Sequence, residues 1–327
     1  MRGPLGCVVA VTYRCNARCA VCDIWKSESD PEKELSPEDY AWLPGTLRSV
    51  NLSGGEPFLR DDLPAIADQV LASCPRARVV ISTNGLMPER IERMMRDMPR
   101  VAVRVSVDAE GDKHDEIRGV EGCFQRAMET VERLRALPVH DLGLAATLSE
   151  RNPGELTRVR RLAGDLGISF IASAAHSSPI FFGSHEQDRP GSEEAASEIR
   201  AIMREDLSSG HPRDWAKAYY ARGLIDYVRG RPRRLACGAG TDHFYLDPYG
   251  NVYPCNISDR LMGSIREGSF EELRRRSWPT LAQAVRECDE QCWMVCTVSP
   301  PMRRRPLGPL AWIAGAKLMG LDTDRNG

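Results

Sequence analysis

The feature that most constrains the fold is a regular alternation of two kinds of segment over the first 175 residues. Short runs rich in apolar and β-branched residues alternate with segments of helical periodicity. This alternation predicts parallel strands joined by right-handed helical crossovers. The expected strands cover residues 8–13, 47–53, 77–83, 101–107, 142–148 and 168–174, and the expected helices cover 37–43, 63–73, 88–98, 124–137 and 153–166.

Six such units are fewer than the eight of a closed barrel, so we predict an α/β chain built on a partial (β/α)6 TIM-like barrel. Two helices near 193–208 and 214–229 extend it. A hairpin is expected at 244–254, with its turn at residues 247–251. We therefore divide the chain into a barrel with its helical extension (1–230), a small cysteine-rich domain (231–300) and a tail (301–327).

Charge and hydropathy restrict the partners. The 327 residues include 44 Lys and Arg against 46 Asp and Glu, a net charge of −2, which does not suggest a nucleic-acid binder. No apolar run is long enough to span a membrane and no signal peptide is evident, so we expect a cytoplasmic protein. The amphiphilic stretch 307–321 follows three arginines, and we expect it to close the barrel in preference to contacting a membrane.

Cysteine is the unusual residue of this chain. There are 11 cysteines, and most of them are clustered. Tight cysteine clusters without an export signal indicate metal sites in a reducing compartment. The clusters are Cys15, Cys19 and Cys22, then Cys237 and Cys255, then Cys288, Cys292 and Cys296, while Cys7, Cys74 and Cys123 stand alone.

The first cluster has the spacing CxxxCxxC, directly after the first expected strand. Three thiolates in one loop can hold three irons of a cubane and leave the fourth iron open. Zinc is the alternative, but a structural zinc needs a fourth ligand. The nearest histidine, His114, is distant in sequence. A loop after a barrel strand lies on the face where active sites gather.

Together with Ser53-Gly54-Gly55-Glu56-Pro57 after the second strand, this loop resembles the radical S-adenosylmethionine (radical SAM) superfamily over about residues 7–175. The resemblance implies a [4Fe–4S] cluster that binds SAM and a flavodoxin or ferredoxin-type electron donor. It also implies a 5′-deoxyadenosyl radical that abstracts hydrogen from the substrate. The cofactor would carry the chemistry, and the protein would bind, orient and exclude water.

The resemblance also suggests which residues bind SAM. Two glycines without Cβ atoms let the backbone approach the SAM amino group closely. For Arg118 two interpretations remain open: contact with the SAM carboxylate, or an ion pair with Asp115. The expected SAM contacts are Gly54, Gly55, Glu56, Asn84, Ser106, Asp108, Arg118 and Thr147.

The later cysteines, in the pattern Cys237-x12-Gly250-x4-Cys255, resemble the opening of a SPASM or Twitch domain, which holds auxiliary iron–sulfur clusters. Five cysteines instead of the seven of a full SPASM domain limit the region to one four-cysteine cluster, which favours the Twitch-like form. The expected ligands are Cys237, Cys255 and Cys296, with Cys292 as the fourth and Cys288 as the alternate. A zinc ribbon is the alternative.

The reaction that we expect is hydrogen abstraction from a small polyol, such as an aminocyclitol, sugar or nucleoside. It would give an oxidation, as in a dehydrogenase, or an epimerisation with Cys123 as hydrogen donor; packing is the alternative role of Cys123. One auxiliary cluster and a first strand that starts near the N-terminus favour this reading over a peptide or protein maturase. An enzyme acting on a lipid glycoconjugate is the third hypothesis.

Overall fold

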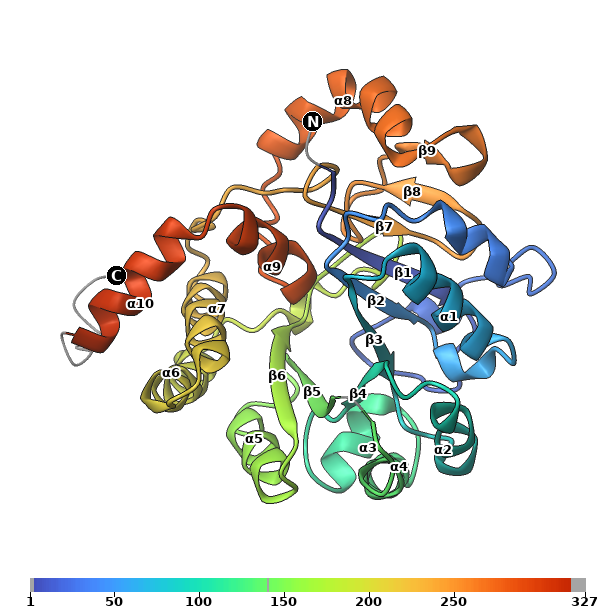
Figure 1. The fold of residues 1–327 in the computed structure, drawn as a ribbon. Coiled ribbons are helices and arrows are strands. Elements are labelled where there is room, and N and C mark those ends of the chain that lie inside the picture. Colours follow the sequence, from blue (N-terminus) through green and yellow to red (C-terminus); the bar gives the residue numbers. More distant parts are fainter. Residues whose placement is uncertain (1–2, 140, 319–327) are drawn as a thin grey trace.

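In the computed structural model, which describes residues 3–139 and 141–318, one curved sheet organises the molecule (Figure 1). Its strand order is β6-β5-β4-β3-β2-β1-β7-β8-β9, and β1 to β6 are all parallel. The open partial barrel predicted from the sequence is confirmed. The six strands are β1 (Gly6–Thr12), β2 (Ser49–Gly54), β3 (Arg78–Thr83), β4 (Ala102–Ser106), β5 (Leu142–Leu148) and β6 (Ser169–Ala174).

Helices cover the outer face of this sheet (Figure 1). Alternate strand residues such as Val9 and Val11 pack against them in one continuous core, which also buries Cys7 and Cys74. Burying this apolar surface provides most of the stabilisation. The covering helices are α1 (Leu63–Ser73), α2 (Pro88–Arg96), α4 (Cys123–Arg135) and α5 (Leu156–Asp165).

Two local differences from prediction have simple causes. The segment expected as a helix at 37–43 is a 3-10 helix, Pro37–Trp42, fixed at its start by a capping box between Ser36 and Asp39. A short helix, α3 (Asp112–Arg118), was not predicted from the sequence. It ends at Gly119, whose φ of +63° is the left-handed conformation that glycine adopts at a helix end.

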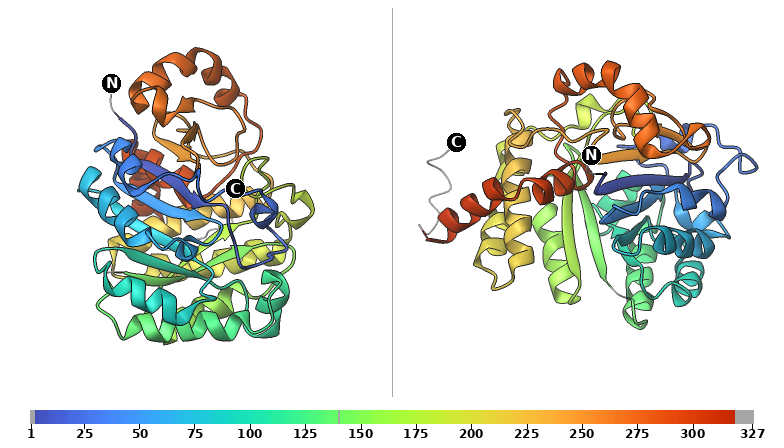
Figure 2. Two further views of the ribbon diagram at one scale, coloured as in Figure 1. Left: turned by 90° about the vertical axis from the view of Figure 1, so that its right-hand side faces the viewer. Right: turned by 45° about the horizontal axis from the view of Figure 1, so that its top comes forward.

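The cysteine-rich region continues the barrel sheet. Strand β7 (His243–Leu246) pairs in parallel with β1, and the predicted hairpin forms between β7 and β8 (Asn251–Tyr253). Asp247 closes its turn by accepting hydrogen bonds from the backbone N–H groups of Tyr249 and Asn251. With β9 (Gly263–Ser264) and the unpredicted helix α8 (Phe270–Arg286), the hairpin forms one end of the molecule (Figure 2).

Three helices from different parts of the chain lie together beside the barrel. Helices α6 (Glu193–Ser208) and α7 (Pro212–Val228) pack against each other, and α10 (Leu307–Leu318) lies along both of them. The prediction that the tail closes the barrel is wrong for 307–318, because Trp312 packs edge-on against Tyr219 of α7 instead. Residues 319–321 lie outside the described part of the chain.

Helix α9 (Val295–Arg304), also unpredicted, takes the place expected for the tail. It contacts β1 and β7, and Pro300 lies against the first residue of β1, where a Cβ on Gly6 would approach the Pro300 ring to 2.8 Å. Among the described residues, no helix combines the length and apolar character needed to cross a bilayer.

Candidate active site

The cysteine loop follows β1 and is held by main-chain hydrogen bonds. The N–H groups of Arg18 and Ala20 donate to the carbonyls of Arg118 and Ile117 at the end of α3, over 2.9 and 2.8 Å. The three thiols are half-buried. Burial raises the pKa of Cys15 to about 11 and that of Cys22 to about 12. The main-chain hydrogen bonds therefore fix the position of the loop against α3.

The two glycines after β2 pack against this loop. The N–H groups of Gly55 and Glu56 donate to the carbonyls of Thr12 and Arg14, each over 2.8 Å. A Cβ on Gly54 would lie 2.2 Å from the Thr12 oxygen, and one on Gly55 would lie 2.0 Å from the Arg14 oxygen. These approaches are possible only for glycine, so the Gly-Gly step sets the distance between β2 and the cysteine loop.

Glu56 is fully buried and accepts three hydrogen bonds. They come from the Thr83 hydroxyl, the Asn84 N–H and the Phe58 N–H, over 2.8, 2.8 and 3.2 Å. Burial raises the pKa of the Glu56 carboxyl to about 7, although these hydrogen bonds lower it. Asn84 in turn donates to Asn16 inside the cysteine loop over 2.7 Å. The ends of β2 and β3 are thus linked to the loop.

Arg118 connects the loop to β4. One guanidinium nitrogen lies 2.7 Å from Asp108 Oδ2, and another lies 3.8 Å from the Cys19 sulfur. Asp115 instead accepts from the N–H groups of Gly122 and Phe124, so the predicted alternative of an Arg118–Asp115 pair is wrong. Burial lowers the pKa of Arg118, but the charges of Asp108 and Cys19 more than offset this and raise it.

The remaining expected SAM contacts lie along the same edge. Thr147 donates its N–H to Asp108 over 2.8 Å, and Ser106 is half-buried at the end of β4. Asn152 supports both strands by donating to the carbonyls of Asp108 and Thr147. The structure therefore brings the expected residues of β2 to β5 together at the carboxyl ends of the strands, and their roles toward SAM stay predictions.

The residues present fit a thiolate-bound cluster and an anionic ligand. The Nε of Arg118 is buried beside Cys19 without a hydrogen-bond partner among the described residues. Within that part of the chain, no three His, Cys, Asp or Glu side chains converge around one point as they would around a single ion. A cubane spreads its thiolates over different irons, so this spread is compatible with a cluster.

Cys123 lies behind the loop. Its thiol is fully buried, packs with Ala17 and Leu86, and lies 3.5 Å from His114 Nε2. Burial raises its pKa to about 12. The contacts that the structure describes are those of a packing residue, and a role as hydrogen donor stays a prediction.

The later cysteines gather at a second position. Cys292 packs with Ile257 and Met294, against which Cys255 and Cys296 also lie. Cys237 acts electrostatically on both Cys255 and Cys292. Burial raises the pKa of Cys255 to about 12 and that of Cys296 to about 11. Cys288 also acts electrostatically on Cys255, but it differs from the other four because it is exposed.

Arg233 holds the segment that carries two of these cysteines. Its guanidinium donates to the carbonyls of Cys292 and Thr297, lies 3.7 Å from the Cys292 sulfur and stacks over Trp293. Arg233 is therefore engaged in packing and hydrogen bonds and is not simply a solvated surface residue. His176 is buried and accepts the Trp293 N–H, so it supports the same segment.

An aromatic bridge, formed by Tyr13, Phe181, Phe182, Tyr245 and Tyr253, connects the two cysteine groups. Cys15 and Cys22 pack against one cluster with Cys296, and Phe181 and Tyr245 lie at its centre. The two rings meet edge-on with centroids 5.6 Å apart, and the Tyr13 and Tyr245 hydroxyls are 3.0 Å apart. Sequence reasoning missed this bridge, although Tyr13 and the Phe181-Phe182 pair flank predicted site segments.

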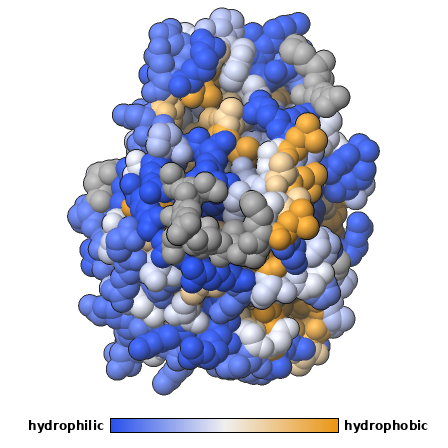
Figure 3. Space-filling view, turned by 90° about the vertical axis from the view of Figure 1, so that its left-hand side faces the viewer, coloured by the Kyte–Doolittle hydropathy of each residue, from blue (hydrophilic) through white to orange (hydrophobic). Residues whose placement is uncertain are grey.

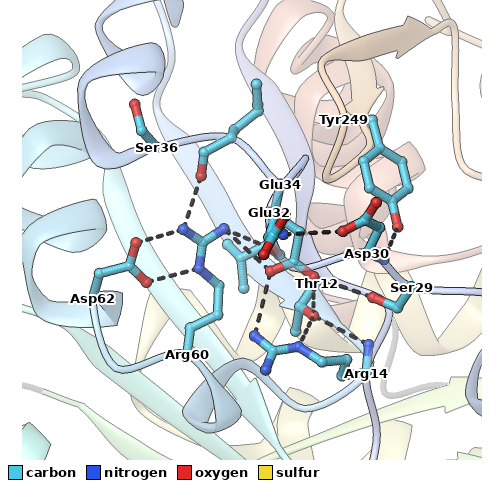
Figure 4. A network of polar contacts seen from close by, with 12 residues as sticks. Thr12, Arg14, Ser29, Asp30, Glu32, Glu34, Ser36, Arg60, Asp62 and Tyr249 are labelled. Carbon is cyan, nitrogen blue, oxygen red and sulfur yellow. Dashed lines mark hydrogen bonds and ion pairs between the residues drawn. The ribbon is translucent and has the colours of Figure 1, made fainter.

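A buried polar network fastens the chain on the other side of the cysteine loop (Figure 4). Glu34 accepts hydrogen bonds from Thr12 and Arg14 and lies 3.7 Å from an Arg60 nitrogen. The same segment reaches the hairpin, where Asp30 donates its N–H to the Tyr249 hydroxyl over 3.1 Å. The network thus ties the start of the cysteine loop to the turn between β7 and β8.

Comparison with known protein families agrees with this geometry. The model of the radical SAM superfamily matches residues 9–152, and the model of SPASM, an iron–sulfur cluster-binding domain, matches residues 237–297. These domains imply SAM, a [4Fe–4S] cluster and auxiliary iron–sulfur ligation. The second match is to SPASM, and the shortened Twitch form stays a prediction.

Similar proteins of known activity span most of this chain. The AdoMet-dependent heme synthase of Methanosarcina barkeri is 27% identical over 282 residues, which cover 80% of each chain. The mycofactocin maturase MftC of Mycolicibacterium smegmatis is 26% identical and covers 82% of this chain and 69% of its own. The Bacillus subtilis sporulation killing factor maturation protein SkfB is 24% identical, and the match covers 83% of this chain and 64% of SkfB.

Solved structures share the fold. Streptococcus suis SuiB bound to its precursor peptide SuiA superposes with a TM-score of 0.63 at 13% identity, over 88% of this chain and 68% of that one. The structure of anSMEcpe with bound AdoMet and a peptide superposes with a TM-score of 0.59 at 13% identity, over 96% of this chain and 100% of that one.

Proposed function

We propose that this chain, which belongs to the radical SAM superfamily and carries a SPASM domain, is a maturase that modifies a peptide or protein by abstracting a hydrogen atom from it. Bound SAM and the cluster would supply the radical. The chain's own residues would hold the cluster through Cys15, Cys19 and Cys22 and would present the substrate between the two cysteine groups. Oxidation through the auxiliary cluster would be the accompanying reaction.

The observation that carries this proposal is the aromatic bridge. Phe181 and Phe182 belong to the apolar cluster against which Cys15, Cys22 and Cys296 pack, so aromatic rings lie between the two cysteine groups. A site that selects a polyol must offer several buried polar groups to its hydroxyls, because unpaired polar groups are what discriminate such substrates. An apolar, aromatic lining instead suits an amino-acid side chain.

The relatives point in the same direction. Two of the similar proteins are maturases of peptide products, and the polyol substrate expected from the sequence has no support among them. That expectation rested on the count of auxiliary cysteines and on the start of the first strand, and neither property describes what lines the site. The polyol reading is therefore replaced.

A tetrapyrrole is the second candidate substrate. The M. barkeri heme synthase and the pre-heme d1 synthase of Dinoroseobacter shibae resemble this chain over 80% and 84% of its length. Flat aromatic rings would also stack on Phe181, Phe182 and Tyr245.

Deuterium transfer separates these candidates. Reconstituted protein, SAM and a reductant are incubated with extract of the source organism grown in deuterated medium, and 5′-deoxyadenosine is analysed for deuterium. Transfer that disappears after protease digestion of the extract is the result expected for a peptide substrate. If deuterium transfer survives digestion and decreases when an iron porphyrin is added as a competitor, the substrate is a tetrapyrrole instead.

A further inference from the structure

Helix α10 exposes an apolar face. Leu307, Leu310 and Leu318 are 81%, 57% and 86% exposed, and the exposed Ala311 and Ala314 lie between them. Leu307, Leu310, Ala314 and Leu318 follow each other at intervals of three or four residues, with Ala311 beside Leu310, so they form one stripe along the helix. Figure 3 shows hydrophobic residues gathered on the face of the molecule that carries α10.

The exposed stripe does not pack against the rest of the protein. The opposite side of α10 already packs on the protein through Ile313 and Ala316, and Trp312 contacts Tyr219 and lies under Arg222. Among the described residues, three of the five exposed large hydrophobic side chains belong to this one helix. Such a gathering of apolar side chains on a surface marks an interaction site.

The charges beside the stripe indicate the partner. Residues 295–318 contain four basic residues and no Asp or Glu, although the whole chain has a net charge of −2. Arg303 and Arg305 are exposed directly before the helix, whereas the Lys317 ammonium donates to the Ser209 carbonyl and lies over the Trp215 ring. Arg304 is held separately by Asp242. An apolar stripe directly preceded by two exposed arginines matches an interfacial helix on an anionic lipid surface.

We propose that α10 docks the protein peripherally on an anionic membrane. Its twelve residues are too short to cross a bilayer but long enough to lie along the interface, with Leu307, Leu310 and Leu318 in the acyl region and Arg303 and Arg305 at the headgroups. This proposal goes beyond the proposed reaction and does not depend on the substrate.

Vesicle sedimentation of the full-length protein tests the proposal. We expect binding to vesicles with about 30% phosphatidylglycerol, weak binding to phosphatidylcholine alone, and loss of binding at high salt. The double variant Leu307→Gln/Leu310→Gln should bind at least about tenfold more weakly. Replacing Arg303 and Arg305 by Gln should weaken binding about fivefold for each charge.

A matched control variant shows whether the loss of any exposed leucine would weaken vesicle binding. Leu261 is 51% exposed between β8 and β9, so Leu261→Gln removes a similar side chain elsewhere and should bind vesicles like the unaltered protein. Equal thermal unfolding temperatures show that all variants fold. The proposal is wrong if the unaltered protein ignores anionic vesicles, or if the double variant binds them equally well. A dimer in size-exclusion chromatography that this variant dissociates, without vesicle binding, would assign the stripe to a second copy of the chain.

Discussion

The two cysteine groups are held in place by different means. Around Cys15, Cys19 and Cys22 the chain uses main-chain hydrogen bonds to neighbouring strand and helix ends, which two glycines bring together and the Asn84–Asn16 contact supplements. Around Cys255 and Cys292 it uses side chains, chiefly Arg233 and Trp293. The first site is therefore built into the barrel itself, whereas the second is assembled from distant segments by tertiary packing.

The largest effect is expected from Cys19→Ala. This change removes one of three cluster ligands that the loop supplies, so SAM cleavage should be abolished, as measured by 5′-deoxyadenosine formation with dithionite. Cys74→Ala is the matched control, because Cys74 is buried in the helical layer away from the loop. Retained cleavage in Cys19→Ala would overturn the radical SAM site.

The second prediction concerns the auxiliary group. Cys255→Ala and Cys292→Ala should each lower the iron content by about four atoms per chain, the content of one cubane, while SAM cleavage persists. Cys288 is exposed, so Cys288→Ala should retain that iron. Iron and acid-labile sulfide analysis after anaerobic reconstitution measures both. Unchanged iron in Cys255→Ala would refute an auxiliary cluster at this position.

The two sites also show which features of the structure could be predicted from the sequence. The barrel strands were predictable because each is a continuous apolar run, and the first cysteine group was predictable because its ligands lie within eight residues. The parallel pairing of β7 with β1 joins residues more than 230 positions apart, and no local pattern encodes such a contact. Helix α9 contains Pro300 and Pro301, which normally argue against a helix.

The unpredicted parts of the site likewise depend on contacts between residues that are distant in sequence. The aromatic bridge joins the residue after β1, the Phe181-Phe182 pair, β7 and β8, so its members are scattered through the sequence. Asp108 as the partner of Arg118 was missed because Asp115 is nearer along the helix, yet Asp115 is already engaged by two backbone N–H groups. Composition and spacing indicate the cofactor, whereas the substrate depends on contacts that only the folded chain makes.

The third prediction tests the rigidity of the first site. Arg118→Met would leave Asp108 buried without its ion pair, which should lower the free energy of unfolding by about 3–5 kcal/mol. The paired variant Arg118→Met/Asp108→Asn should recover part of this loss, because it removes the stranded charge. The single variant Asp108→Asn completes the cycle, and urea unfolding is measured for all four proteins. Independent, additive effects of the two changes would contradict the coupling.

The fourth prediction is a pH dependence at the same site. The Glu56 carboxyl has a pKa of about 7 when folded, above its ordinary value of 4.5, because it is buried. The folded state therefore retains a proton that the unfolded state releases, so this group's contribution to stability decreases as pH rises from about 4.5 to 7. The decrease should amount to about 3 kcal/mol in protein without SAM.

Glu56→Gln provides the comparison for this pH dependence. Its amide does not titrate, so the free energy of unfolding should change less between pH 5 and 7 than in the unaltered protein. The readout is the slope against pH, since the amide also disturbs the hydrogen bonds from Thr83 and Asn84. Equal slopes in the two proteins would show that Glu56 does not titrate in this range.

The smallest effect is expected from Arg233→Met. Like Arg118, Arg233 has a guanidinium nitrogen near a cysteine sulfur, but its partners are carbonyls and an aromatic ring instead of a carboxylate. Its loss strands no opposite charge, so we expect a cost of about 1–3 kcal/mol from unpaired carbonyls. The auxiliary iron should be lost faster on exposure to a chelator, while the iron of the first site is unaffected. A loss of stability as large as that of Arg118→Met would show that the second site is as rigidly built as the first.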